Sequence, residues 1–134
     1  HIVDEDYINN HSDIVRGSHM QITDSLFLAP TTEQEWHDTL IGINHSCKPN
    51  AYVSGDVCFR AYRKIKAGEE ITIDYGTAFS TDSQAFDCIC GEEQCRRFIR
   101  PQTDWQASEI QERHEGHFAA FLERRIMKEQ NEAL

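Results

Sequence analysis

Three cysteines lie close together in the second half of this 134-residue chain. Cys88, Cys90 and Cys95 form a C-x-C-x4-C cluster. Thiolates at this spacing can share one zinc ion, but a structural zinc site takes four ligands. Cys47 and Cys58 are both candidates for the fourth. Five cysteines are an odd number and no export signal is seen, so metal-bound or free thiols are expected rather than a disulfide framework.

Two further segments carry polar side chains between apolar stretches. Residues 44–50 read Asn-His-Ser-Cys-Lys-Pro-Asn. Buried amides and imidazoles need partners, so this cluster predicts a structural turn or a ligand site. Residues 67–76 end on Tyr75 and Gly76 and place a Tyr at the end of an expected strand. Its hydroxyl is expected either to reach into a cleft or to lie at the rim with the ring in the core.

In this order, the three segments resemble the SET family of protein lysine methyltransferases. The C-terminal half of that family carries Asn-His-Ser-Cys-x-Pro-Asn, then Gly-Glu-Glu-(Leu/Ile)-Thr-x-Asp-Tyr, then a post-SET C-x-C-x4-C. The likeness covers residues 20–97. It implies a mainly β fold, the SET-type β-clip, with a C-terminal helix. It also implies S-adenosylmethionine-dependent methyl transfer to a lysine side chain of a protein or peptide.

The roles of the family's residues carry over by position. The resemblance implies that Tyr75 is catalytic, and that Asn44 and His45 contact S-adenosylmethionine. Ile73 lies where the family often has a Phe or Tyr that limits the number of methyl groups, so a roomy channel and more than one methylation round are expected. The zinc ligands that it implies are Cys47, Cys88, Cys90 and Cys95. Cys58 is then an ordinary strand residue.

The same resemblance divides the chain into three parts. Residues 1–86 are expected to be the C-terminal portion of a SET domain, 87–100 the post-SET zinc segment, and 101–134 a helical tail similar to that of bacterial stand-alone SET proteins. The family's N-terminal part has a G-x-G loop that holds the cofactor, and this sequence has none. Part of the cofactor site is therefore expected upstream of His1, so the chain alone need not be active even if the resemblance implies an enzyme. This leaves a second function open, a non-catalytic zinc-stabilised binding module.

The elements that must position these residues are short. Strands are expected at residues 21–23 and 26–28, at 51–54 and 57–62 around Gly55 and Asp56, and at 70–75. A short helix with Trp36 and Leu40 on one face is expected within residues 32–41. From Ser108 a helical stripe, capped by Ser108 and Gln111 and interrupted at Gly116, is expected to pack on the domain. Residues 17–20 match a sequence that expression tags commonly leave behind, but they are interpreted as native. Residues 114–117 are interpreted as a helix surface or a helix break.

The overall charge excludes some classes of partner. The net charge of −10 argues against direct nucleic-acid binding, and it suits a Lys-rich peptide or simply keeps the protein soluble. No apolar run approaches the roughly 18 residues that a membrane span needs. We therefore expect an intracellular, cytoplasmic protein that acts on a lysine-containing protein or peptide.

Overall fold

A three-stranded antiparallel sheet is built near the N-terminus. The computed structural model of the protein describes residues 1–15, 17–38, 42–82 and 85–134. The strands β1 (Ile2–Asp4), β2 (Met20–Gln21) and β3 (Leu26–Leu28) lie in the order β1-β3-β2. Two helices, α1 (Glu5–Asn10) and α2 (Ser12–Val15), join β1 to β2. They close a small core with the sheet through Ile8, Val15, Phe27 and Ala29.

The sequence predicted part of this region. The β2–β3 hairpin is confirmed, whereas β1, α1 and α2 were not predicted. His19 and Met20 are buried, so the native interpretation of residues 17–20 agrees with the fold. The predicted helix at 32–41 is observed as α3 (Glu33–Asp38) with Trp36 half-buried, while Leu40 lies outside the described residues.

Two pairs of strands form the centre of the molecule. β4 (Asn44–His45) pairs in parallel with β7 (Thr72–Ile73), and β5 (Ala51–Ser54) pairs with β6 (Cys58–Ala61) in the predicted hairpin. The predicted strand at 70–75 is therefore shorter than expected. Its end turns into the 3-10 helix η1 (Tyr75–Thr77).

The C-terminal part combines one hairpin with three helices. β8 (Phe86–Asp87) and β9 (Phe98–Ile99) pair around the cysteine segment. The helices are α4 (Pro101–Asp104), α5 (Ser108–Arg113) and α6 (Ala120–Glu132).

The break in the predicted tail helix is confirmed, but the predicted cap is wrong. Gly116 lies between α5 and α6 with φ +74°. Ala107 is the N-cap of α5, so Ser108 is already inside the helix. The Gln111 side chain instead donates to the Trp105 carbonyl at 3.1 Å.

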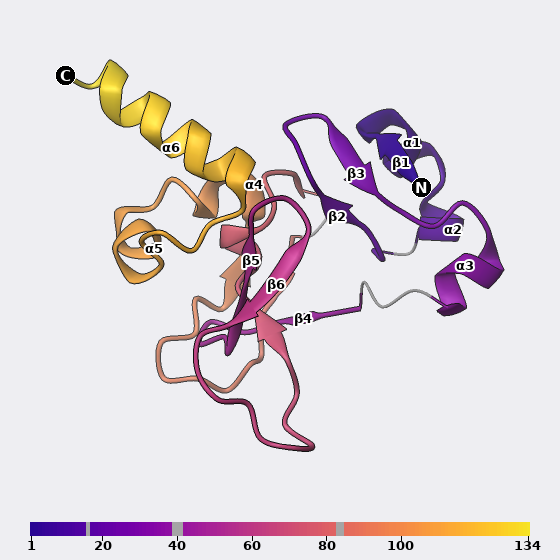
Figure 1. Ribbon diagram of the computed structural model, residues 1–134, viewed down its shortest axis with the longest axis horizontal. Helices are drawn as coiled ribbons and strands as arrows, with labels where there is room; N and C mark the ends of the chain where they lie inside the picture. Colours follow the sequence, from indigo (N-terminus) through magenta and orange to yellow (C-terminus); the bar gives the residue numbers. More distant parts are fainter. Residues whose placement is uncertain (16, 39–41, 83–84) are drawn as a thin grey trace.

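The main core joins the tail to the central strands. Figure 1 shows the N-terminal sheet and α1–α3 at one end, α5 and α6 at the other, and the β5–β6 hairpin between them. The predicted apolar stripe of the tail is buried against residues such as Val53 and Ile73, through Ile110, Phe118, Phe121, Leu122 and Ile126. The β-rich fold of short strands with a C-terminal helix is thus as predicted. No helix of the described stretches is long and apolar enough to cross a membrane.

Candidate functional site

Four cysteine sulfurs converge beside the β8–β9 hairpin. Cys47 approaches from the turn after β4 and meets Cys88, Cys90 and Cys95, all four sulfurs lying within 4.8 Å of one another. Sulfurs around a tetrahedral zinc with bonds of about 2.3 Å stand about 3.8 Å apart. The Sγ atoms of Cys47 and Cys88 are 3.9 Å apart, so the arrangement fits one metal ion. Cys58 lies outside the cluster, exposed on β6.

The surroundings of Cys47 suit a metal-bound thiolate. The backbone N–H of Arg96 donates to its Sγ at 3.4 Å, and Nε2 of His45 lies 3.3 Å from the same sulfur. Such N–H donors stabilise thiolate charge in metal sites. Burial raises the pKa of Cys47, and it raises the pKa of Cys88 to about 11. A cation between the sulfurs would reverse this preference, because metal binding favours the deprotonated thiol.

The ring of His45 points into the protein, with only 1% of the side chain exposed. Its Nδ1 accepts the backbone N–H of Tyr75 at 3.0 Å, which assigns the ring hydrogen to Nε2, facing Cys47. Burial lowers the pKa of His45 to about 4, so the ring is neutral at pH 7. His45 therefore connects the Tyr75 backbone to the cysteine cluster.

Asn44, the neighbour of His45 on β4, is exposed. Its side-chain amide donates to Oε1 of Glu70 at 2.7 Å. Of the two residues expected to contact the cofactor, Asn44 thus offers its side chain at the surface, whereas His45 directs its ring inward.

Tyr75 and Ile73 line the same narrow cavity. It has a volume of about 20 Å³ and further walls from Met20, Ile43 and Phe79. That volume suits one water molecule or one methyl-sized group. The Tyr75 hydroxyl donates to the Ile43 carbonyl at 2.7 Å. The cavity is therefore lined mainly by apolar side chains, with His19 and Tyr75 as its polar residues.

The ring of Tyr75 is held between the main core and the cysteine cluster. It packs edge-on against His45, Phe79 and Phe86, with ring centroids 5.2–5.7 Å apart. Burial raises the pKa of Tyr75, so its hydroxyl stays protonated at neutral pH. Tyr75 thus packs its ring in the core and also lines the cavity, with its hydroxyl bound to the Ile43 carbonyl.

Asp74 is a fully buried carboxylate that sequence reasoning missed. Both of its oxygens accept from the Arg96 guanidinium at 2.7 Å, and Oδ1 also accepts the Gly76 N–H at 2.9 Å. Burial alone would raise the pKa of Asp74, but Arg96 and His114 hold it well below its usual range. Arg96 directly follows Cys95, so a charged residue beside the cysteine cluster was the available signal.

His114 in the tail faces this carboxylate. Its Nε2 lies 3.4 Å from Oδ2 of Asp74, long for a hydrogen bond, and its Nδ1 lies 2.9 Å from the Tyr62 hydroxyl. The side chain is only 4% exposed. The interpretation of residues 114–117 as a helix surface is therefore wrong for His114, although the break is real.

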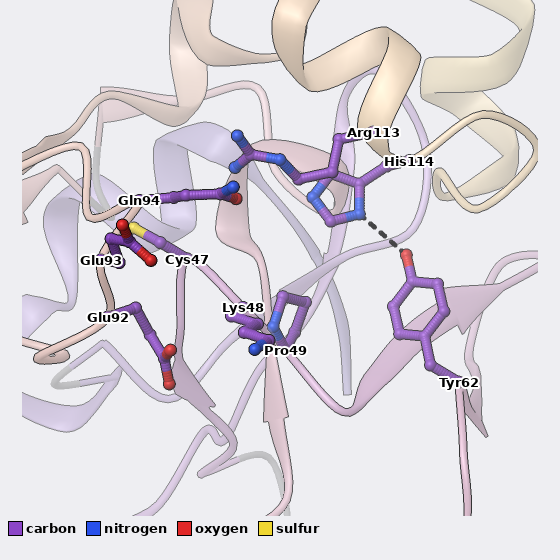
Figure 2. Close-up of a pocket in the computed structure, with 9 residues that line it drawn as sticks. All are labelled: Cys47, Lys48, Pro49, Tyr62, Glu92, Glu93, Gln94, Arg113 and His114. Carbon is purple, nitrogen blue, oxygen red and sulfur yellow. Dashed lines mark hydrogen bonds between the residues drawn. The ribbon is translucent and has the colours of Figure 1, made fainter.

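A larger pocket opens between the tail and the cysteine segment. It has a volume of about 460 Å³. Figure 2 shows Tyr62 hydrogen-bonded to His114 on one side of the pocket and Glu92 and Glu93 on the other side. The side chain of Arg113 extends toward Gln94. The walls thus carry both positive and negative side chains.

The comparisons with known proteins agree with these motifs. The chain is 43% identical over 74 residues to "Histone-lysine N-methyltransferase, H3 lysine-36 specific" of Candida albicans, covering 49% of this chain and 8% of that protein. It is 41% identical over 64 residues to "Histone-lysine N-methyltransferase set-2" of Caenorhabditis elegans, covering 42% and 4%. "Histone-lysine N-methyltransferase 2B" of Homo sapiens is equally similar, covering 42% and 2%.

The chain thus spans less than a tenth of the length of each of these three relatives. The SET domain family itself matches residues 2–76, which hold β1 through the middle of η1 and both upstream motifs. That match covers more than half of the 134 residues, and the chain therefore belongs to the SET domain family.

Proposed function

We propose that this chain transfers methyl groups from S-adenosylmethionine to a lysine side chain of a protein. The observation that carries the proposal is the apolar cavity shared by Tyr75 and Ile73 next to β4. The similarity to proteins named histone-lysine N-methyltransferases supports it and makes histone-like basic tails the first substrates to try. The net charge of −10 favours a cationic substrate.

The residues of the cavity suit this chemistry. S-adenosylmethionine would supply an electrophilic methyl group on its sulfonium. The lysine amine has an ordinary pKa of about 10.4 and is nucleophilic only when neutral. Apolar walls such as Ile73 and Phe79 disfavour the ammonium form.

Tyr75 would orient the amine. Its hydroxyl hydrogen is directed to the Ile43 carbonyl, which leaves oxygen lone pairs free to accept a hydrogen bond from the amine. An amine held in line with the sulfonium methyl needs no covalent intermediate, so positioning supplies much of the rate. Asn44 and His45 are proposed to contact the cofactor, His45 through its backbone because its ring is directed inward.

The remaining parts of the proposal concern the C-terminal third. Cys47, Cys88, Cys90 and Cys95 are proposed to bind one zinc ion that fixes the post-SET segment, residues 87–100, to the turn after β4. Its role is structural, because four thiolates leave no open coordination position. The tail from residue 101 is proposed to be the extension found in bacterial stand-alone SET proteins.

Methyl transfer can be measured directly. The chain joined to an N-terminal SET segment that carries the G-x-G loop, together with S-adenosylmethionine and Lys-rich histone-tail peptides, should yield peptides heavier by one or more methyl groups in mass spectrometry. Tyr75→Phe should lower the rate about 100-fold, because the group that orients the amine is lost. Methyl transfer at the same rate in this variant would overturn the assignment of Tyr75.

A non-catalytic, zinc-stabilised binding module is the second candidate, favoured by the lack of a G-x-G loop. Titration calorimetry separates the two functions. The enzyme should bind S-adenosylmethionine, whereas the binding module should bind the basic peptide alone and give no methylated product.

A further inference from the structure

His114 lies outside the part of the chain that matches the SET family, yet it faces the residue next to Tyr75. We infer that His114 is a positioning residue for Tyr75 and acts through the buried carboxylate of Asp74. The inference rests on the proposed function of Tyr75. It makes the helical tail a part of the methyl-transfer site.

The carboxylate of Asp74 has polar neighbours on three sides. Arg96 donates to both oxygens from the cysteine segment, and Gly76 N–H donates from the chain that follows. From the tail, Nε2 of His114 lies 3.4 Å from Oδ2 and has no other partner among the described residues. A buried charge keeps one orientation only while polar partners surround it. His114 adds a polar neighbour from outside the matched region.

The orientation of Asp74 sets the start of η1. The Asp74 side chain caps this short helix by accepting from Gly76, and Tyr75 is its first residue. The backbone N–H of Tyr75 is bound at the same time by His45, whose Nδ1 lies 3.7 Å from Oδ1 of Asp74. A rotation of the carboxylate would therefore shift the residue whose hydroxyl lines the cavity.

The ring of His114 is itself fixed. With its hydrogen on Nε2 facing the carboxylate, Nδ1 can accept from the Tyr62 hydroxyl at 2.9 Å (Figure 2). The tail also docks onto η1 directly, because Ala119 N–H donates to the Thr77 carbonyl at 2.9 Å. Tyr62, His114 and Asp74 thus form one connected path to Tyr75.

The test compares three tail variants of the metal-loaded protein. His114→Ala should lower kcat for methyl transfer about 10-fold with little change in peptide KM, because the reacting groups are misplaced while binding surfaces persist. His114→Gln, whose amide can still donate to Asp74, should recover part of the rate. His117→Ala, which removes an imidazole that packs on Tyr62 at 4.9 Å, should keep the normal rate.

A second readout does not depend on activity. The ring signal of Tyr75 in ¹³C-tyrosine NMR, assigned with Tyr75→Phe, should shift in His114→Ala and in Tyr62→Phe but not in His117→Ala. An unchanged Tyr75 signal, or an unchanged kcat in an active protein, overturns the inference. A wild-type protein with no methyl transfer would instead refute the proposed function, and the NMR shift alone would then decide whether His114 positions Tyr75.

Discussion

The side chain of Ile73 sets the space beside the Tyr75 hydroxyl. It is 3% exposed and contributes to both the main core and the wall of the cavity. Ile73 is smaller than Phe or Tyr and has no hydroxyl to hold a water molecule. At the scale of this residue, the proposed reaction should therefore admit an amine that already carries a methyl group.

Ile73→Phe should restrict the reaction to one methyl group, whereas the wild-type protein should add two or three. Overpacking of the buried site is expected to cost about 1–3 kcal/mol of stability. Mass spectrometry of the peptide after exhaustive reaction measures the product. Ile71→Phe is the matched control, because Ile71 is 48% exposed and lies outside the cavity. Strict monomethylation by the wild type would mean that another residue narrows the channel.

The buried charge of Asp74 is the main electrostatic contribution of the site to the free energy of unfolding. Asp74→Asn leaves the Arg96 guanidinium partly unpaired in the interior, which should cost about 3–5 kcal/mol in the free energy of unfolding. Because the pKa of Asp74 is lowered in the folded state, its contribution is complete above the unfolded value of about 3.9 and is lost as the pH falls through the folded value.

As the pH falls below about 4, the wild-type protein should accordingly lose stability more steeply than Asp74→Asn. Urea unfolding at a series of pH values measures this slope. The exposed Asp87→Asn serves as the control and should behave like the wild type. Equal slopes for Asp74→Asn and the wild type would show that this carboxylate does not govern acid stability.

At the scale of the elements, the break between α5 and α6 brings His114 to the interior. Gly116 adopts φ +74°, and a Cβ added there would meet open space. The only cost of Gly116→Ala is then the left-handed backbone, about 1–2 kcal/mol. Gly116→Asn should lose less, because Asn tolerates this conformation better. Thermal unfolding of the two variants and the wild type measures these costs. A Gly116→Ala variant as stable as the wild type would exclude backbone strain at this position.

Elements with local signals were predicted well, and those that depend on distant contacts were not. Gly55 and Gly116 mark a hairpin and a helix break through their own backbone preferences. The predicted strand at 70–75 ends early because Asp74 caps η1, and Asp74 is held by Arg96, 22 residues away. β1 and α1 were missed because they are stabilised by packing on β3.

The candidate site follows the same division. The convergence of the four cysteines was predicted from their motifs. The catalytic role of Tyr75 rests on its motif alone and stays a proposal. The contact between His114 and Asp74 joins residues 40 positions apart in different segments, and residues 114–117 show only a helix break in the sequence. Polar groups that are buried against each other come together only when the chain folds, so no local sequence pattern predicts the contact.

At the scale of the whole molecule, the cysteine cluster joins chain segments that are far apart in sequence. Cys47 and Cys88 are 41 residues apart, and the other two cysteines lie in the segment between β8 and β9. The cluster forms its own small core with Ile99, against which Tyr75 packs. Zinc binding should therefore stabilise the segment between β8 and β9 and the Tyr75 environment together.

Removal of the metal tests this coupling. The purified protein should carry one zinc ion per chain by elemental analysis, and prolonged treatment with a strong chelator should lower Tm by about 10 °C. Methyl transfer should fall as well, because the Arg96 backbone binds Cys47 while its side chain holds Asp74 beside Tyr75.

Two cysteine variants make the test specific to the cluster. Cys47→Ser should lose zinc and behave like the chelated protein, since Cys47 is fully buried and supplies the ligand from the turn after β4. Cys58→Ser should keep the metal, Tm and activity, because Cys58 is exposed on β6 away from the other four. If Cys47→Ser kept its zinc while Cys58→Ser lost it, the fourth ligand would be Cys58. If Tm stayed unchanged after the chelator had removed the metal, packing around Ile99 alone would hold the segment between β8 and β9 in place.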